Sequence, residues 1–185
     1  MFEIPENLAP ETYPMAWLVG TWRGYGSIGY PGIEQAPMIC ELEVFNNGGP
    51  YLTVNGTWYL ANESIEKVDM ELPGDQGVAQ LTEERLWQAF TGFLRQSPEK
   101  EGELEAMIAS PDGRATLFVG VVKAPRMNLV SDTIVRSATG AHVDASQLQV
   151  AMVDSDLLFA YDMSAFGEEM QSYAAGRLSK VRENN

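Results

Sequence analysis

Residues 17–33 read WLVGTWRGYGSIGYPGI, and this stretch decides the fold that we expect. Successive side chains of a strand point to opposite faces, so Gly20, Trp22, Gly24 and Gly26 share one face. A single indole then lies among glycines, which leave room for a neighbouring backbone or a flat ligand. Two interpretations stay open: Trp22 plugs one end of a barrel whose glycines permit tight curvature, with or without a cavity above it, or Trp22 faces a ligand.

Alternation of apolar and polar residues continues outward from this stretch. Met38, Cys40, Leu42 and Val44 point one way while the glutamates between them point the other, which is typical of a half-buried strand. Similar patterns occur in 147–152 and 157–163. Turn signals separate the runs, and the strongest are Asn46-Asn47-Gly48-Gly49-Pro50, Ser110-Pro111-Asp112-Gly113 and Asp154-Ser155-Asp156.

The fold class that these runs predict is all-β, because no rhythm of strands and long amphipathic helices is present. About ten antiparallel strands in a meander would close into an up-and-down barrel, like a lipocalin or a fatty-acid-binding protein, to remove its edges. Segment 73–84 is predicted as a loop, and a helical turn is predicted around 165–171. The expected strands are 17–28, 37–45, 50–60, 64–71, 85–95, 103–109, 114–122, 127–135, 146–153 together with 157–163, and 173–182.

A single domain is expected from the length of 185 residues. Residues 1–16 read as a leader, with a short helical turn before Trp17, that covers one end of the barrel, and the barrel itself is assigned to 17–183. The segment 62–83 reads as an insertion whose role the sequence does not explain.

Charge and cysteine content narrow the partners and the compartment. The formal net charge of -14, from 26 acidic and 12 basic side chains, repels phosphate backbones and anionic lipid surfaces, so we expect no nucleic acid and no membrane as partners. Cys40 has no second cysteine to pair with, which favours a reducing cytoplasm. No signal peptide and no stretch long enough to span a bilayer is found. The glycosylation pattern Asn62-Glu63-Ser64 is therefore interpreted as chance.

The string Gly-x-Trp-x-Gly-x-Gly at 20–26, followed by Tyr30-Pro31-Gly32-Ile33, resembles the nitrobindin family of haem-binding ten-stranded barrels. The similarity continues through Phe90-Thr91-Gly92-Phe93-Leu94-Arg95 and through Tyr161-Asp162-Met163-Ser164-Ala165-Phe166-Gly167, then Gln171, Arg177 and Leu178. It extends from about Trp17 to Val181, interrupted at 62–83. The resemblance implies the barrel fold, haem binding, nitric oxide binding at ferric haem and conversion of peroxynitrite to nitrate.

Three positions depart from the family's pattern. Tyr173 stands where the family has the histidine that binds haem iron, Gly32 where it has threonine in Tyr-Pro-Thr-Ile, and Ala141 where it has a lysine. The family's activities depend on the iron and cannot be carried over directly. A phenolate at Tyr173 could ligate ferric haem only with a basic neighbour to deprotonate it. Arg177 would share the face of Tyr173 in a regular strand, about two pleats away.

Other catalytic chemistry has little support in the sequence. His142 is the only histidine and lies in a polar stretch, so no histidine-based metal site is expected. A Ser-His-Asp set with Asp144 lacks a nucleophile elbow, and Cys40 reads as a small buried hydrophobe. The pairs Glu83-Glu84 and Glu168-Glu169 read as solvated. No catalytic residue is predicted, and if the chain is an enzyme, the resemblance implies peroxynitrite isomerisation.

The function that we expect is non-catalytic binding of a small apolar or tetrapyrrole-like molecule in the barrel. No cofactor is expected, with haem b kept as an alternative in which the axial ligand is changed or absent. A second alternative is a filled barrel that binds a protein partner, and a homodimer stays open. Candidates to line the cavity are Trp22, Gly32, Phe45, Trp58, Trp87, Phe118, Tyr161, Met163 and Tyr173.

Overall fold

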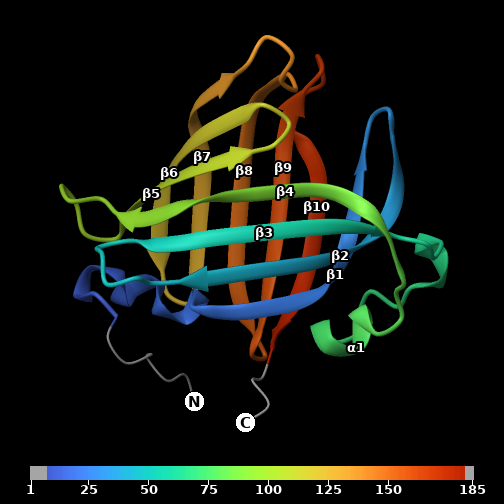
Figure 1. Cartoon of the computed structure of the whole chain (residues 1–185), viewed down its shortest axis with the longest axis horizontal. Helices are drawn as coiled ribbons and strands as arrows, with labels where there is room; N and C mark the ends of the chain where they lie inside the picture. Colours follow the sequence, from blue (N-terminus) through green and yellow to red (C-terminus); the bar gives the residue numbers. More distant parts are fainter. Residues whose placement is uncertain (1–7, 182–185) are drawn as a thin grey trace.

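The computed structural model describes residues 8–181 and shows one closed antiparallel barrel of ten strands within them. Each strand pairs with the next along the chain, and β1 closes the ring against β10 (Figure 1). The predicted all-β, up-and-down barrel is confirmed. The strands are β1 Gly20–Tyr30, β2 Ile33–Phe45, β3 Leu52–Ala61, β4 Glu83–Gln96, β5 Glu103–Ser110, β6 Arg114–Lys123, β7 Arg126–Arg136, β8 Val143–Val153, β9 Asp156–Ala165 and β10 Gln171–Lys180.

Four local predictions were wrong. Segment 73–84 is not a loop throughout, because it carries the one-turn helix α1 (Gly74–Val78) and the start of β4 at Glu83. Segment 64–71 is not a strand, because it carries the short 3-10 helix η2 (Ile65–Lys67) and turns. The runs 146–153 and 157–163, counted as one strand, form β8 and β9 on either side of a turn with Asp154 and Ser155 at positive φ. The expected helix around 165–171 is instead a turn, in which the Ser164 hydroxyl donates to the Glu168 carbonyl.

One end of the barrel is covered by the 3-10 helix η1 (Pro10–Leu18). Met15, Trp17 and Leu18 of η1 are buried, and η1 contacts β4 and β6. We call this the η1 end, and we call the opposite end, where β1 finishes, the Tyr30 end. Residues 1–7 of the predicted leader, and residue 182 of the predicted last strand, lie outside the described residues.

Glycines let β1 and β10 approach each other closely. A Cβ atom on Gly24 would lie 2.0 Å from the carbonyl oxygen of Arg177, and one on Gly26 would lie 2.1 Å from that of Ala175. Trp22 precedes these glycines on β1 and is closer to the η1 end. It is 1% exposed, and its Nε1 donates to the Leu18 carbonyl at 2.8 Å. The geometry therefore matches the interpretation of Trp22 as a plug and of the glycines as the residues that permit close strand contact.

The insertion at 62–83 packs on the outside of the barrel, against β1 and β10. It carries η2 and the one-turn helix α1 (Gly74–Val78), and Val68 and Val78 bury the outward side chains of Tyr25 and Ile39. The Tyr25 hydroxyl contacts the carbonyls of Asp69 at 3.1 Å and Leu72 at 2.8 Å. The insertion thus forms a second, small apolar layer outside the main core.

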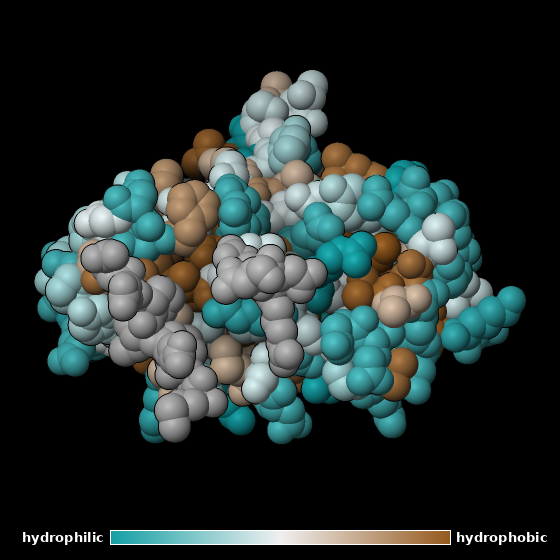
Figure 2. Space-filling view, turned by 60° about the horizontal axis from the view of Figure 1, so that its bottom comes forward, coloured by the Kyte–Doolittle hydropathy of each residue, from teal (hydrophilic) through white to brown (hydrophobic). Residues whose placement is uncertain are grey.

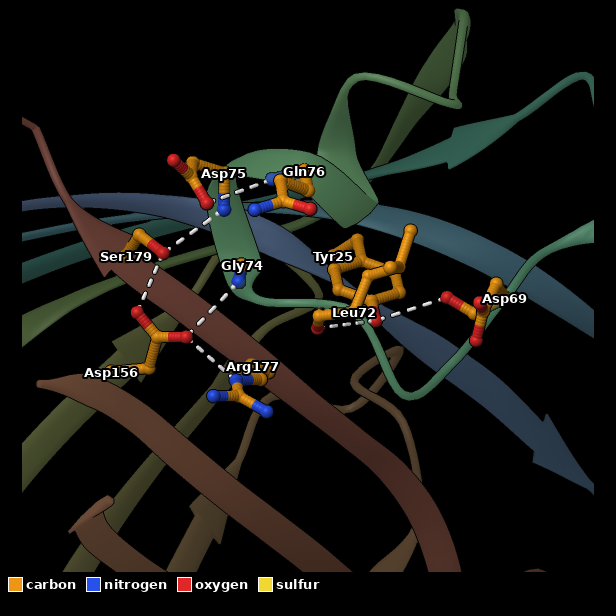
Figure 3. A network of polar contacts seen from close by, with 9 residues as sticks. All are labelled: Tyr25, Asp69, Leu72, Gly74, Asp75, Gln76, Asp156, Arg177 and Ser179. Atoms are coloured by element: carbon orange, nitrogen blue, oxygen red, sulfur yellow. Dashed lines mark hydrogen bonds and ion pairs between the residues drawn. The ribbon is translucent and has the colours of Figure 1, made fainter. Parts of the chain in front are cut away.

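A buried carboxylate holds the other side of the insertion to the barrel, as Figure 3 shows. Asp156 accepts hydrogen bonds from Gly74 N at 3.1 Å, Arg177 Nε at 2.6 Å and Ser179 Oγ at 2.6 Å. Burial raises the pKa of Asp156, but the three hydrogen bonds and the Arg177 charge outweigh it and hold this pKa below its usual range.

Hydrophilic residues predominate on the face that Figure 2 shows, and hydrophobic residues form separate patches between them. No helix among residues 8–181 is both long and apolar enough to cross a membrane.

Candidate functional site

The barrel interior contains an apolar cavity of about 160 Å³. Leu18, Leu157 and Leu178 line it at the η1 end, and Trp58, Phe90, Phe118 and Phe159 are among the aromatic residues along its wall. Trp58 stacks on Phe159 with the ring centroids 5.6 Å apart. Inward-facing residues of most strands thus leave a space that side chains do not fill.

Polar side chains line the cavity at its other end, near Tyr30. Gln88, Ser110, Arg114 and Thr116 all belong to this lining, and Ser110 pairs directly with Arg114 where β5 meets β6. The Arg114 side chain is only 9% exposed, and its Nε and Nη2 both bind one carboxylate oxygen of Asp112, at 2.7 Å and 2.6 Å. The cavity therefore has an apolar end and an end that offers hydrogen-bond donors.

Sequence reasoning missed these four polar residues. Arg114 alternates with Thr116 and Phe118 on the inward face of β6, directly after the Asp112-Gly113 turn. An arginine on the same face as buried apolar residues is the signal that could have identified it.

Tyr173, which the sequence predicts to occupy the family's iron-ligand position, faces the interior because of a β-bulge. In the β9–β10 pairing Ser172 is opposite Asp162 and Ala174 is opposite Tyr161, so Tyr173 is the extra residue. A bulge reorients the side chain that it carries. Arg177 binds Asp156 under the insertion on the outer face, so Tyr173 and Arg177 do not share a face as the regular-strand expectation required.

Trp87 also lies at a bulge, on β4, where Trp58 pairs with Gln88 and Tyr59 with Leu86. The Trp87 Nε1 donates to the Tyr173 hydroxyl at 2.8 Å. Tyr173 also packs against Tyr30, Trp58 and Tyr161, with ring centroids 6.0 to 6.4 Å away. Two bulges on distant strands thus build an aromatic cluster around Tyr173.

Tyr173 is 7% exposed and lines neither the apolar cavity nor a second pocket at the Tyr30 end. Burial raises the pKa of the Tyr173 phenol above its ordinary value, although the Trp87 N–H and the Arg114 charge oppose that effect. The phenol is therefore protonated at neutral pH, and its oxygen accepts a hydrogen bond from the Trp87 indole.

A second pocket, of about 600 Å³, lies at the Tyr30 end outside this cluster. Gly32, Ile33, Leu60 and Trp87 line it, together with the polar residues at the start of the insertion. Gly32 occupies the β1–β2 turn with φ of 81°, a conformation that favours glycine, and a Cβ there would meet only open space. The lining of this pocket includes Glu34, Glu63 and Glu66, but no histidine, cysteine, methionine or tyrosine.

The other predicted cavity residues divide into four groups. Trp58, Phe118 and Tyr161 line the apolar cavity, and Gly32 and Trp87 line the 600 Å³ pocket. Trp22 and Met163 are buried in the core outside both. Phe45 does not face the interior and is 38% exposed. The even-numbered residues of 38–44 face inward, so the odd-numbered Phe45 that follows them points outward.

Among the reactive residues, Cys40 is fully buried, and desolvation strongly raises the pKa of its thiol. His142 and Asp144 lie 3.6 Å apart, and both are exposed. Within residues 8–181, no three His, Cys, Asp and Glu side chains gather as a metal site requires.

The residues around Tyr173 do not fit an iron-bound haem as they are arranged. A tyrosine that ligates haem iron does so as a phenolate, whereas the Tyr173 hydroxyl is protonated, hydrogen-bonded to Trp87 and enclosed by aromatic rings. Trp87 lines the 600 Å³ pocket and lies between that space and the Tyr173 oxygen.

The closed barrel and its interior cavity define an up-and-down β-barrel with internal space as the class of protein. Residues 11–180 match the family described as "THAP4-like, heme-binding beta-barrel domain". The chain belongs to this family, and its resemblance to the nitrobindins is confirmed.

Two relatives show how the family is named. A "Ferric nitrobindin-like protein" of Beutenbergia cavernae is 36% identical over 97% of this chain and 99% of its own length. A "Peroxynitrite isomerase" of Frankia casuarinae is 36% identical over 96% of this chain and 89% of its own. The crystal structure of Rv2717c from M. tuberculosis has the same fold, with a TM-score of 0.74 at 24% identity, covering 95% of this chain and 99% of that one.

Proposed function

We propose that this protein binds a small apolar molecule inside the barrel and does not hold haem iron at the family's position. One observation supports the proposal that haem iron is not held there: the Tyr173 hydroxyl accepts a hydrogen bond from the Trp87 N–H within a closed aromatic cluster. An iron bond there would require deprotonation of a buried phenol and displacement of the indole. Peroxynitrite isomerisation through ferric haem is therefore not proposed as the main activity.

The apolar cavity supports the first part of the proposal. Its wall is aliphatic and aromatic, with a few polar groups at one end, as is usual for small-molecule sites. An engineered cavity of about 150 Å³ in another protein binds benzene, so a space of about 160 Å³ is large enough for a compact ligand. This free volume favours ligand binding over the filled barrel that only recognises a protein.

Ferric haem titration tests the iron part of the proposal. We expect wild-type protein to give no sharp, saturable Soret band at one equivalent of haem. Tyr173→His supplies an imidazole, and Tyr173→His with Trp87→Leu also removes the indole that covers it, so the double variant is expected to give the strongest band. Tyr173→Phe serves as a control that lacks any ligand atom. A sharp stoichiometric band in wild type would contradict the proposal.

Native mass spectrometry of freshly isolated protein tests the ligand part. We expect a retained small molecule that is lost on denaturation. Protein that is always free of ligand, and that takes up no apolar compound offered to it, would contradict this part.

A second candidate is a ferric haem protein with a changed or absent axial ligand. The 600 Å³ pocket at the Tyr30 end and the relatives named peroxynitrite isomerase favour it. Haem bound there would lack a strong axial ligand from the pocket lining, and the measurement that separates this candidate is peroxynitrite conversion to nitrate with and without added haem.

A further inference from the structure

The polar end of the apolar cavity carries side chains that are free to bond a ligand. Within the described residues, the side chains of Gln88, Ser110 and Thr116 line the cavity and make no hydrogen bond to the protein. Each can donate an N–H or an O–H, and each can also accept. The neighbouring Arg114 guanidinium can only donate, so it decides which kind of ligand group fits this end.

Arg114 adds a charge to this set of donors. Asp112 binds the Nε and Nη2 edge of the guanidinium, and Nη1 has no partner within residues 8–181. The Arg114 charge is close enough to the phenols of Tyr161 and Tyr173 to act on both. Arg114 therefore lines the cavity near the aromatic cluster with one guanidinium nitrogen unpaired within residues 8–181.

The chemistry of these donors selects the group that would bind. A carboxylate accepts hydrogen bonds at both oxygens, and a carboxylate beside an arginine makes charge-assisted bonds stronger than neutral ones. A protonated amine would meet the guanidinium as a like charge. An alcohol would use only part of the donor set.

The size of the cavity limits the rest of the ligand. Its volume of about 160 Å³ is close to that of the engineered cavity that holds benzene, about 150 Å³. The hydrocarbon part would lie among Leu18, Leu157 and Leu178 and the aromatic wall.

We propose that the cavity binds a compact monocarboxylic acid, with its carboxylate at Arg114, Ser110, Thr116 and Gln88 and an apolar part of about benzene size toward the η1 end. This inference rests on the proposed function and names the ligand class of the same site. Asp112 already neutralises part of the Arg114 charge. The quantity to measure is therefore the ratio of the affinities for the acid and for a neutral analogue of the same shape.

Isothermal titration calorimetry with 3-phenylpropanoate and 3-phenylpropan-1-ol compares two probes that differ only in the polar group. Wild type is expected to bind the acid at least about tenfold more tightly than the alcohol, as expected for a hydrogen bond to a charged group. Arg114→Gln is expected to abolish this preference while the alcohol still binds. Retained alcohol binding shows that the variant is folded.

Two further variants complete the experiment. Arg95→Gln removes an arginine that pairs with Glu105 on the outer face, and it is expected to keep the preference of wild type. Asp112→Asn with Arg114→Gln leaves no unpaired carboxylate, so it replaces Arg114→Gln if that variant is unstable.

Equal affinity of wild type for acid and alcohol would overturn the carboxylate inference and leave the proposed apolar-ligand function standing. A preference that survives in Arg114→Gln, or tighter binding of 3-phenylpropylamine than of the acid, would also overturn it. Binding of neither probe would overturn the ligand class, and native mass spectrometry and the haem titration would still judge the proposed function.

Discussion

Single residues at bulges and close contacts determine what the barrel interior contains. The bulges at Trp87 and Tyr173 bring the indole and the phenol into one hydrogen bond at 2.8 Å. Tyr173 therefore lies inside the barrel among the rings of Tyr30, Trp58 and Tyr161.

Gly24 and Gly32 give a matched test at the residue scale. In Gly24→Ala the new Cβ would overlap the Arg177 carbonyl oxygen, so β1 and β10 must separate, and we expect a loss of about 3 kcal/mol or more in the free energy of unfolding. In Gly32→Ala the Cβ meets open space and only the positive φ matters, with an expected loss of about 1–2 kcal/mol. Urea denaturation measures both, and equal losses would contradict the close-contact explanation.

At the scale of elements, the insertion at 62–83 acts as an outer layer over β1 and β10. Tyr25 binds carbonyls of the insertion on one side, and Asp156 binds the Gly74 N–H on the other. A Cβ on Gly77 would lie 1.9 Å from the Tyr25 ring, so α1 lies flat against β1. The insertion therefore stabilises the strands that close the barrel.

Asp156 makes the stability of this layer depend on pH. The folded-state pKa of Asp156 is below that of an unfolded aspartate, about 3.9, so its stabilising contribution is present above about pH 4 and is lost as the pH falls through the folded value. Asp156→Asn is expected to lower the free energy of unfolding by about 3 kcal/mol at pH 7, because Arg177 loses a buried partner.

Thermal or urea unfolding from pH 7 to pH 2 checks this prediction. The difference between wild type and Asp156→Asn is expected to shrink below about pH 4. A difference that stays constant over this range would show that the Asp156 charge is not the source of the stability. Glu41→Gln, which affects an exposed pair with Arg23, is the control and is expected to have little effect.

At the scale of the whole molecule, the excess of acidic residues acts on stability. With 26 acidic and 12 basic side chains, self-repulsion opposes the compact state. Screening shortens the range of that repulsion from about 30 Å at 0.01 M salt to about 8 Å at 0.15 M.

The melting temperature is therefore expected to rise when sodium chloride is increased over about this range. Differential scanning calorimetry measures it, and potassium chloride distinguishes screening from specific binding of sodium. A melting temperature that falls with both salts would show that screened ion pairs outweigh the repulsion.

Much of the fold could be predicted because alternation and turn chemistry are local. The apolar residues of 38–44 and 157–163 mark single-faced strands, the Asp112-Gly113 turn marks a hairpin, and the glycine-rich string at 20–26 indicates a close strand contact. The replacement of the iron ligand by Tyr173 depends on residue identity alone, and it stays a prediction.

Only the tertiary structure decided which way several side chains point and what lies near them. Bulges at Trp87 and Tyr173 arise from pairing with neighbouring strands, so alternation along one strand does not reveal them. The same holds for 64–71, whose Val68 packs on the outward side chain of Tyr25 and not in a strand, and for Arg114, whose place at the end of the cavity depends on closure of the ring. Local pattern determined the barrel, while contacts between distant segments determined the cavity and its chemistry.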